Sequence, residues 1–405
     1  MLNHAGVPIE SFSEPSSRDS ERPTLICLSH LRWNFVFQRP QHLMSRFAED
    51  MPVVFWEEPM DIGAHETAFL QVREAEGFPS VRVVVPHLPQ SLNDQQRDAN
   101  LKSLLDGFVS TLSRPLVAWY YTPMMLSFSR HLDTSALVYD CMDELSKFRF
   151  APEELLELEQ ELIDKADLVF TGGSSLFEVK KDRHDSVHLF PSSVDRAHFG
   201  KARTAIEDPA DQADLPHPRL GFFGVIDERF DIDLLDRIAE MRPDWSFVMV
   251  GPVVKIAPED LPQRPNIHYL GAKTYNQLPS YLAGWGVALM PFAMNESTQF
   301  ISPTKTPEYL AGGKPVVSTP VKDVVRHYGQ LEGVQIAGDA ETFVAACEKA
   351  LELAKDRGGQ WLAEADLLLS ATSWQTTQAR MAGLIAKALG TRTVQTSPAL
   401  LVAAE

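Results

Sequence analysis

The chain has 405 residues, a hydrophobic content of 44%, a charged content of 23% and a formal net charge of −18. This composition is typical of a folded globular protein, and the length suggests two or three domains. The acidic balance argues against a general nucleic-acid-binding role, because neutralising phosphates requires a basic face.

The three cysteines, Cys27, Cys141 and Cys347, lie far apart in apolar surroundings. This spacing fits neither a disulfide framework nor a zinc site. No apolar run approaches the ~20 residues that cross a bilayer, and the polar first segment does not look like a secretory signal. We therefore expect a cytoplasmic protein whose residues 1–22 are disordered.

From residue 24 onward, short β-rich runs alternate with helical patterns. We expect strands at 24–30, 52–59, 81–86, 115–121, 135–144, 167–173 and 187–193, and helices at 41–50, 94–112, 152–165 and 174–183. Strands that alternate with helices predict a parallel sheet in an α/β fold. We assign this first domain to residues 23–200.

A second cycle follows a polar, proline-containing stretch at 201–218, which has the composition of a linker. We expect strands at 219–226, 245–252, 266–271, 285–292, 314–320 and 333–338, and helices at 231–242, 274–284, 303–313, 340–355 and 359–370. The second domain is thus assigned to 219–370. Together the two cycles predict two Rossmann-like, doubly wound parallel-sheet domains.

The end of the chain carries one more helical pattern, at 371–390. We expect this helix to cross back to the first domain and to be capped by Gly390. Residues 391–405 are predicted to be a flexible tail.

A helix start with chemical potential follows the strand at 285–292. Ser302 and Thr306 each precede a proline, a pattern typical of a hydroxyl cap followed by the first helical position. In open α/β sheets, ligands bind outside the carboxyl ends of strands, and the N–H groups of a helix start attract phosphate. Lys305 adds positive charge there. Glu308 either accepts hydrogen bonds from a ribose diol or only complements the helix dipole.

Carboxylates gather at the end of the strand at 135–144, where Asp140, Asp143 and Glu144 are followed by Lys147 and Arg149. Close carboxylates can act as acid and base, because like charges raise one pKa. They can equally cap the next helix or pair with the two cations. We place Asp143 in a ligand cleft, together with His30 at the end of the first strand.

Five segments, in this order, resemble one family of enzymes: LSHLRWNFVFQRPQHLMSRFA at 28–48, VVFWEEP at 53–59, PSSVD at 191–195, GFFGVIDERFDIDLL at 221–235 and SPTKTPEYLAGGKPVVSTP at 302–320. They look like retaining GT-B glycosyltransferases of family 4 (glycosyl transferases group 1). Within that family they are most similar to the subgroup for teichuronic acid and cell-wall polysaccharide synthesis. The resemblance covers about residues 24–385.

The resemblance implies a nucleotide-sugar donor held mainly by the second domain and an acceptor held mainly by the first. It implies no obligatory metal or other cofactor. A family glutamate that contacts the donor ribose matches Glu308, whereas a second one, eight positions earlier, is replaced here by Phe300. Asn295 and Glu296 lie nearby and could substitute for it.

Arg229 and Lys305 are carried over as contacts of the diphosphate, although Arg229 could instead form a surface ion pair with Asp227 or Asp231. The expected donor-binding set is Glu308, Arg229, Lys305, Ser302, Thr304, Asn295 and Gly224. The expected catalytic set is Asp143, His30 and Lys305. The PSSVD phrase is interpreted as a structural turn that ends the first domain.

The loop at 30–40 interleaves Trp33, Phe35 and Phe37 with Arg32 and Arg39. Aromatic faces stack on sugar rings, and arginine forks bind carboxylate or phosphate. We expect Arg32, Trp33 and Arg39 to bind the acceptor and the phenylalanines to pack into the core. The alternative is that the aromatic residues only pack the loop onto its neighbours.

We predict a retaining glycosyltransferase of the hexosyltransferase type, acting on a glycan or lipid-linked acceptor in surface polysaccharide synthesis. With a lipid-linked acceptor, the protein would work at the inner face of the membrane as a peripheral protein. Two alternatives stay open. One is a sugar-nucleotide epimerase of the same fold; the other, suggested by Phe300, is a non-catalytic nucleotide-sugar or glycan-binding component of an assembly complex.

Overall fold

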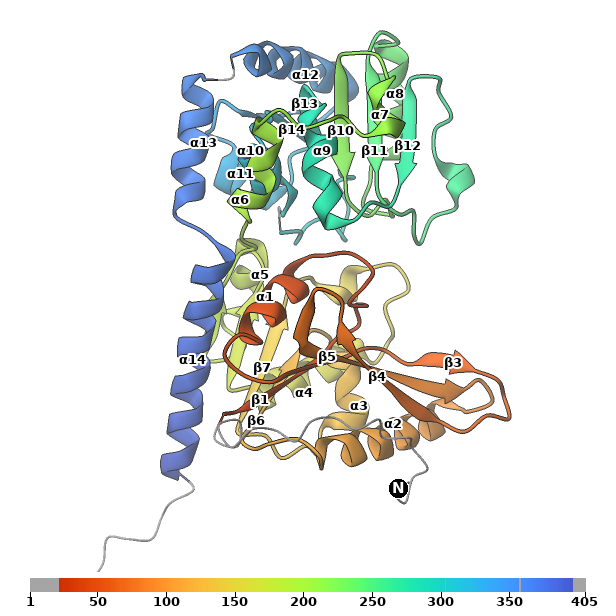
Figure 1. The fold of residues 1–405 in the computed structure, drawn as a ribbon, viewed down its shortest axis with the longest axis vertical. Helices are drawn as coiled ribbons and strands as arrows, with labels where there is room; N and C mark the ends of the chain where they lie inside the picture. Colours follow the sequence, from red (N-terminus) through yellow and green to blue (C-terminus); the bar gives the residue numbers. More distant parts are fainter. Residues whose placement is uncertain (1–21, 303, 357, 396–405) are drawn as a thin grey trace, which may run out of the picture.

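A computed structural model of the protein describes residues 22–302, 304–356 and 358–395. It forms two lobes stacked along the long axis, with the N-terminal half below and the C-terminal half above in Figure 1. Apart from residue 22, the predicted disordered start lies outside the described residues, as do residues 396–405 of the predicted tail.

The N-terminal lobe is built on a nine-stranded sheet in the order β3-β5-β2-β1-β6-β7-β8-β9, with β4 paired to β5. The strands are β1 Thr24–Leu28, β2 Val53–Trp56, β3 Met60–Ile62, β4 Phe69–Ala75, β5 Phe78–Pro89, β6 Leu116–Tyr120, β7 Ala136–Cys141, β8 Leu168–Thr171 and β9 Val187–Leu189. The helices are α1 Arg39–Phe47, α2 Asp94–Val109, α3 Leu126–Ser129, α4 Leu155–Lys165 and α5 Ser174–Lys180.

Alternate residues of the buried strands point to opposite faces of this sheet. Leu25 and Cys27 of β1 belong to one hydrophobic cluster, and Ile26 and Leu28 belong to another. Helices therefore cover both faces, as a parallel sheet requires. The antiparallel hairpin of β4 and β5 was not predicted; with β3 it projects from the side of the lower lobe (Figure 1).

The C-terminal lobe contains a six-stranded, all-parallel sheet in the order β12-β11-β10-β13-β14-β15, the 3-2-1-4-5-6 order of a Rossmann fold. The strands are β10 Arg219–Phe223, β11 Ser246–Val250, β12 Ile267–Gly271, β13 Val287–Met290, β14 Val316–Ser318 and β15 Val334–Ile336. The helices are α8 Ile232–Met241, α9 Leu278–Ala283, α10 Lys305–Ala311, α11 Lys322–Tyr328, α12 Ala340–Lys355 and α13 Gln360–Ser370. The predicted fold class, two doubly wound α/β domains, is confirmed; α11 was missed.

The stretch predicted as a linker is packed onto the C-terminal lobe. It contains α7 Ala210–Ala213 and follows α6 Arg196–Phe199. The buried Gln212 side chain donates to the Tyr281 carbonyl at 3.1 Å and accepts from the Trp285 indole at 2.8 Å. These bonds explain why a polar sequence forms a fixed connection here.

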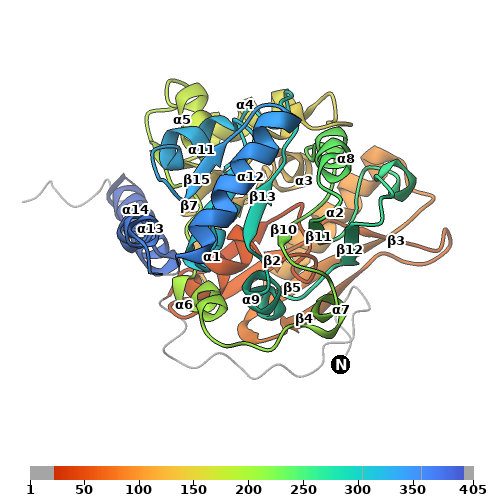
Figure 2. The ribbon, with the colours of Figure 1, turned by 90° about the horizontal axis from the view of Figure 1, so that it is seen from above.

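The last helix, α14 Trp374–Gln395, returns to the N-terminal lobe, where Trp374, Met381 and Ile385 join the hydrophobic core. Figure 2 shows α13 and α14 at the same edge of the molecule, and Figure 1 shows them end to end. The predicted cap at Gly390 is wrong, because the helix continues through it. One glycine inside a helix costs only about 1 kcal/mol.

The three cysteines are buried and free. Within the described ranges, no helix is long and apolar enough to cross a membrane.

Candidate functional site

A cavity of about 110 Å³ lies between the lobes, at the carboxyl ends of β7, β10 and β13. This is the edge at which open parallel sheets bind ligands. Both lobes contribute to its lining: Val36, Gln38, Arg39, Met142, Asp143 and Ser192 from the first, and Phe222, Gly224, Val225, Arg229, Met290, Phe292, Ile301, Ser302, Thr304 and Lys305 from the second. Of the predicted residues, the cavity thus brings together seven: Asp143, Arg39, Gly224, Arg229, Ser302, Thr304 and Lys305.

A wider groove, of about 960 Å³, is lined by residues that include Arg242, Trp245 and Glu348. It opens at the amino ends of the second sheet, away from the interlobe cavity, and contains none of the predicted site residues.

Gly224 lines the interlobe cavity, and Gly251 packs against the backbone of Gly224. Gly224 and Gly251 follow β10 and β11 with φ angles of 153° and 149°. A Cβ atom on Gly251 would lie 1.7 Å from the carbonyl oxygen of Gly224, and one on Gly224 would lie 2.9 Å from the Phe222 ring. Side chains are therefore excluded at both positions, and the backbone itself lines the site.

Helix α10 contributes Lys305 to the cavity lining, and Glu308, which is not a lining residue, lies next to Lys305. The Lys305 ammonium lies 3.5 Å from a Glu308 carboxylate oxygen, and Glu308 is only 13% exposed. Burial raises the pKa of Glu308, and the charge of Lys305 partly offsets that rise. The hydroxyl of Ser302 is buried and has no hydrogen-bond partner. These groups can still form bonds to a polar ligand.

The predicted caps of this helix are wrong. Thr304 is the N-cap, with helical backbone angles and no side-chain cap bond. Thr306 lies inside the first turn, where its hydroxyl contacts the Met290 sulfur at 2.9 Å. Pro303, the second half of the first predicted cap, lies outside the described residues.

Arg229 lines the cavity, but its guanidinium is engaged. Its Nε and one Nη donate to the two carboxylate oxygens of Asp227 at 2.9 and 2.6 Å. The structure therefore shows the alternative arrangement, in which Arg229 forms an ion pair with Asp227. Asp231 instead caps α8 by accepting from Leu234 N at 2.9 Å.

Of the three carboxylates near the end of β7, only Asp143 faces the cavity. Burial raises its pKa to about 6; Arg229 opposes this shift and Asp227 adds to it. Asp140 pairs with Arg39, and Glu144 pairs with Lys180 at 2.9 Å. The alternative of a pairing with Lys147 or Arg149 is therefore wrong for these two carboxylates.

His30 lies two residues beyond β1, and its Nδ1 atom is buried without a hydrogen-bond partner. Burial, together with the positive charge of Lys255, lowers the pKa of His30 to about 4. The imidazole is therefore neutral near pH 7.

The three residues expected to bind the acceptor form contacts with other parts of the protein. Arg39 is 2% exposed and donates to both Asp140 oxygens, at 2.9 and 2.8 Å, and to the Phe190 carbonyl at 2.7 Å. Trp33 is 4% exposed and packs edge-on against Phe55.

Arg32 donates to Glu57 at 3.2 Å and to the carbonyls of Glu58 and Pro59, so it braces the neighbouring loop. The expectation that both phenylalanines pack is correct for Phe37, which is half-buried and stacks on Phe78, and wrong for Phe35, which is 48% exposed.

Neither proposed substitute for the missing glutamate faces the cavity. Phe300 packs against the core of the N-terminal lobe. Asn295 Oδ1 accepts from Ser297 N at 3.0 Å, and Asn295 Nδ2 donates to the Glu228 carbonyl at 3.3 Å. Glu296 is exposed and pairs with Lys147 across the two lobes.

Sequence reasoning missed Glu228 and Lys255, which lie beside the cavity. The sequence contains a signal for Glu228, which immediately follows Asp227 in the loop after β10. That loop was interpreted only for its arginine. Among the described residues, no cluster of three or more His, Cys, Asp or Glu side chains could hold a metal ion.

The fold is that of GT-B glycosyltransferases. Sucrose-phosphate synthase from Thermosynechococcus elongatus superposes with a TM-score of 0.66 at 13% identity, covering 91% of this chain and 100% of that one. Trehalose 6-phosphate synthase from Burkholderia multivorans gives 0.65 at 13% identity, over 94% and 100%. Anabaena HepE, in a complex with UDP and glucose, gives 0.63 at 14% identity, over 89% and 99%.

Residues 217–353, which lie in the C-terminal lobe, match the family profile described as glycosyl transferases group 1. The Bacillus subtilis (strain 168) protein TuaH, named as a candidate teichuronic acid biosynthesis glycosyltransferase, is 28% identical over 255 residues. This match covers 58% of the present chain and spans 63% of the length of that relative.

Proposed function

We propose that the protein is a retaining glycosyltransferase that moves a hexose from a nucleotide diphosphate donor to a glycan or lipid-linked acceptor in cell-wall polysaccharide synthesis. The observation that carries the proposal is the polar interlobe cavity. It is lined by Gly224, Arg229 and Lys305, all inside the segment that matches the group 1 profile. The resemblance to TuaH supports the cell-wall role. With a lipid-linked acceptor, the protein would act as a peripheral protein at the inner face of the membrane.

The donor diphosphate would lie over the Gly224 backbone, next to the Lys305 ammonium. Positive charge placed where a leaving diphosphate gains negative charge stabilises the transition state. Glu308 would accept hydrogen bonds from the ribose hydroxyls, exchanging its 3.5 Å contact with Lys305 for them. Lys305 would then be released toward the phosphates.

The acceptor hydroxyl would approach from the N-terminal lobe, where Asp143 and His30 lie. Asp143, with a pKa near 6, is ionised at neutral pH and can orient or deprotonate that hydroxyl. Attack from the face that the diphosphate leaves would retain the anomeric configuration. Closure of the lobes would exclude water and so limit hydrolysis of the donor.

A thermal-shift screen with UDP, GDP, dTDP and CDP, with and without EDTA, tests the donor site. A ligand at ~100 times its dissociation constant should stabilise the protein by about 2.7 kcal/mol. We expect one nucleotide to stabilise it regardless of EDTA, and Glu308→Ala to abolish the effect. Glu352→Ala, a change at an exposed ion pair on α12, is the matched control and should leave the shift intact.

Absence of a shift with all four nucleotides would contradict the proposal. Conversion of a nucleotide sugar without any acceptor would instead indicate an epimerase.

A further inference from the structure

Glu228 lies beside the interlobe cavity in a well-supported loop. Its neighbours Val225 and Arg229 line the cavity. The loop is held to the segment after β13 by three bonds: Asp231 N to the Pro291 carbonyl at 2.8 Å, Ala293 N to the Arg229 carbonyl at 2.8 Å, and Asn295 Nδ2 to the Glu228 carbonyl at 3.3 Å. The position of Glu228 is therefore fixed by the backbone on both sides of it.

The carboxylate of Glu228 is nevertheless unused. Both of its oxygens are buried without a hydrogen-bond partner, and the side chain is 12% exposed. The Lys255 ammonium, at 3.6 Å, is within ion-pair range but beyond hydrogen-bond distance. Leaving a buried acceptor unsatisfied costs about 1–3 kcal/mol, and more when it is charged. Folded proteins contain few such groups, and each calls for an explanation, of which a bound ligand is one.

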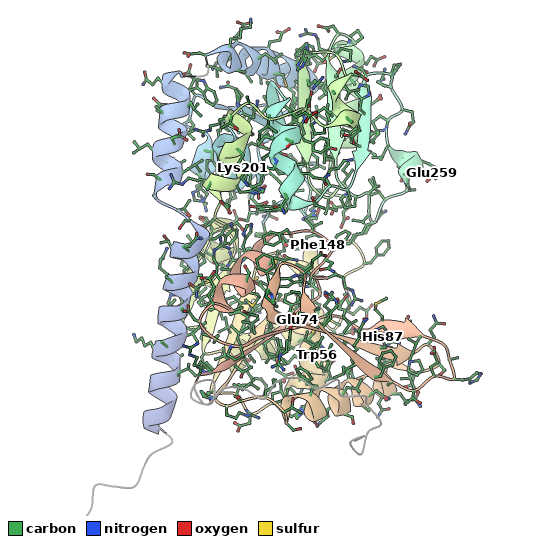
Figure 3. All side chains as sticks on the ribbon, viewed as in Figure 1. Trp56, Glu74, His87, Phe148, Lys201 and Glu259 are labelled. Carbon is green, nitrogen blue, oxygen red and sulfur yellow. The ribbon has the colours of Figure 1, made fainter. Side chains whose placement is uncertain are left out.

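Lys255 is held in an unusual way next to this carboxylate. Its φ of 63° is one of two positive values among the non-glycine residues that the structure describes. The ammonium lies 4.8 Å from the centre of the Phe148 ring, which comes from the N-terminal lobe. Figure 3 shows Phe148 at the junction of the lobes. Backbone strain of this kind is concentrated at functional sites, where the surrounding structure maintains it.

The N-terminal lobe supplies a further polar atom without a partner. His30 Nδ1 is buried and makes no hydrogen bond, and the charge of Lys255 acts on this imidazole. Two carboxylate oxygens from one lobe and one imidazole nitrogen from the other are thus without partners, and Lys255 interacts electrostatically with both groups.

We propose that Glu228 and Lys255 bind neighbouring hydroxyl groups of the transferred sugar, taking the place of the family glutamate that Phe300 replaces. A carboxylate accepts two O–H bonds from adjacent hydroxyls, while the ammonium donates to a hydroxyl oxygen. The negative charge of Glu228 disfavours phosphate at this point, which leaves the diphosphate to Gly224 and Lys305. The assignment rests on the proposed function and specifies its sugar subsite.

The test compares Kd values of a bare nucleoside diphosphate with those of its glucose, galactose and mannose forms. The nucleotide is the one among UDP, GDP, dTDP and CDP that stabilises the wild type. We expect at least one sugar form to bind tenfold or more tightly than the bare diphosphate. Glu228→Gln should bind that sugar form about tenfold more weakly than the wild type does. Its Kd for the bare diphosphate should stay within twofold of the wild-type value.

Two further variants separate ligand binding from folding. Glu259→Gln alters an exposed residue at the outer edge of the same lobe and should change nothing (Figure 3). Lys255→Gly accommodates the positive φ and removes the ammonium, so it should weaken binding of the sugar form while its Kd for the bare diphosphate stays within twofold of the wild-type value, a split that a purely structural role does not produce.

The inference is overturned if Glu228→Gln keeps the full sugar preference, if it weakens sugar form and bare diphosphate equally, or if the wild type shows no sugar preference. In these outcomes the diphosphate still binds and the proposed function survives. Failure of every diphosphate to bind the wild type would overturn both.

Discussion

Arg39 illustrates how a residue can have the right chemistry and a different use. It is the first residue of α1, where a free guanidinium would face the cleft. The guanidinium instead donates to Asp140, 101 residues away in the sequence. Burial of both partners makes the pair a brace between α1 and β7. Removing one member leaves an uncompensated buried charge, whereas replacing both with apolar residues need not.

We therefore expect Arg39→Ala to lower the free energy of unfolding by about 3–5 kcal/mol. The double variant Arg39→Met, Asp140→Leu should recover most of that loss, as measured by urea denaturation. A loss under 1 kcal/mol in Arg39→Ala, accompanied by weakened transfer to acceptor, would restore the ligand-binding role first expected for this residue.

Asp143 should show a conflict between stability and activity. Its pKa rises from 3.8 to about 6 on folding, so between these values the native state binds more protons than the unfolded state. Stability therefore falls as the pH rises from about 4 to 6, and it remains reduced above 6. Asp143→Asn should be about 1–3 kcal/mol more stable than the wild type at pH 7.5 and equal to it near pH 4.

The same variant should lose about 100-fold or more in turnover, because the ionised carboxylate is absent. Urea titrations at both pH values and a transfer assay check the two effects. A variant that is no more stable at pH 7.5 would contradict the burial argument for Asp143, and full activity would remove it from the catalytic set.

At the scale of elements, polar contacts between α5 and α11 join the two lobes. Asp323 of α11 is buried and accepts from Ser175 N of α5 at 3.1 Å and from its hydroxyl at 2.7 Å. Nearby, Glu178 of α5 pairs with Lys322 and Arg326 at the surface, at 3.0 and 2.6 Å. The same pair of helices thus carries one buried contact and one exposed contact.

These two contacts give a matched comparison. Asp323→Ala should destabilise the protein by about 2–3 kcal/mol, because it leaves buried donors of Ser175 unsatisfied. Glu178→Ala should cost less than about 1 kcal/mol, as exposed ion pairs do. Chemical denaturation measures both. Equal losses of stability would mean that burial does not determine the strength of the Asp323–Ser175 contact.

The close approach of Gly224 and Gly251, which follow the parallel neighbours β10 and β11, gives a second element-scale prediction. Gly251→Ala places Cβ in the Gly224 carbonyl and should cost more than about 3 kcal/mol, whereas Gly271→Ala, at a φ of 69° in open space, should cost only about 1 kcal/mol. Melting curves compare the two variants. A mild Gly251→Ala would show that this backbone contact can shift and is not fixed by the two glycines.

Buried strands and helices with regularly spaced apolar residues could be predicted from the sequence, even where they are short, and partly exposed elements of mixed sequence could not. The pattern at 340–355 predicted α12 with its bounds, because its apolar residues recur at helical spacing over a 16-residue run. By contrast, β4 has a partly exposed, mixed sequence that only its pairing with β5 makes a strand. The start of α10 was misjudged because Thr306 bonds to a distant Met290 rather than to its own helix end.

At the scale of the whole molecule, the two-lobed architecture and the edge that carries the site could be predicted, since both follow from buried strands alternating with helices. The polar contacts between residues far apart in the sequence could not be predicted. Ser175 and Asp323 are 148 residues apart, and Lys147 and Glu296 are 149 apart. Each of these residues has several possible partners in the sequence, and only the docking of the lobes selects one.

The size of the cavity bears on how the molecule would work. A volume of about 110 Å³ holds a few water molecules, whereas ligand sites for larger molecules usually measure about 300–1,000 Å³. A nucleotide sugar therefore requires the lobes to move apart or the lining side chains to rearrange. The chain crosses between lobes near Ser193 and Thr372, whose hydroxyls bond at 2.8 Å, and rotation would occur about this point.

Hydrogen–deuterium exchange with and without the stabilising nucleoside diphosphate sugar tests the central claim most directly, namely that one ligand is held between the two lobes. The account predicts protection at 142–144 in the N-terminal lobe together with 224–230 and 304–308 in the C-terminal lobe, all of it weakened in Glu308→Ala. Protection confined to the groove at Arg242 and Trp245, or none in either lobe, would contradict it.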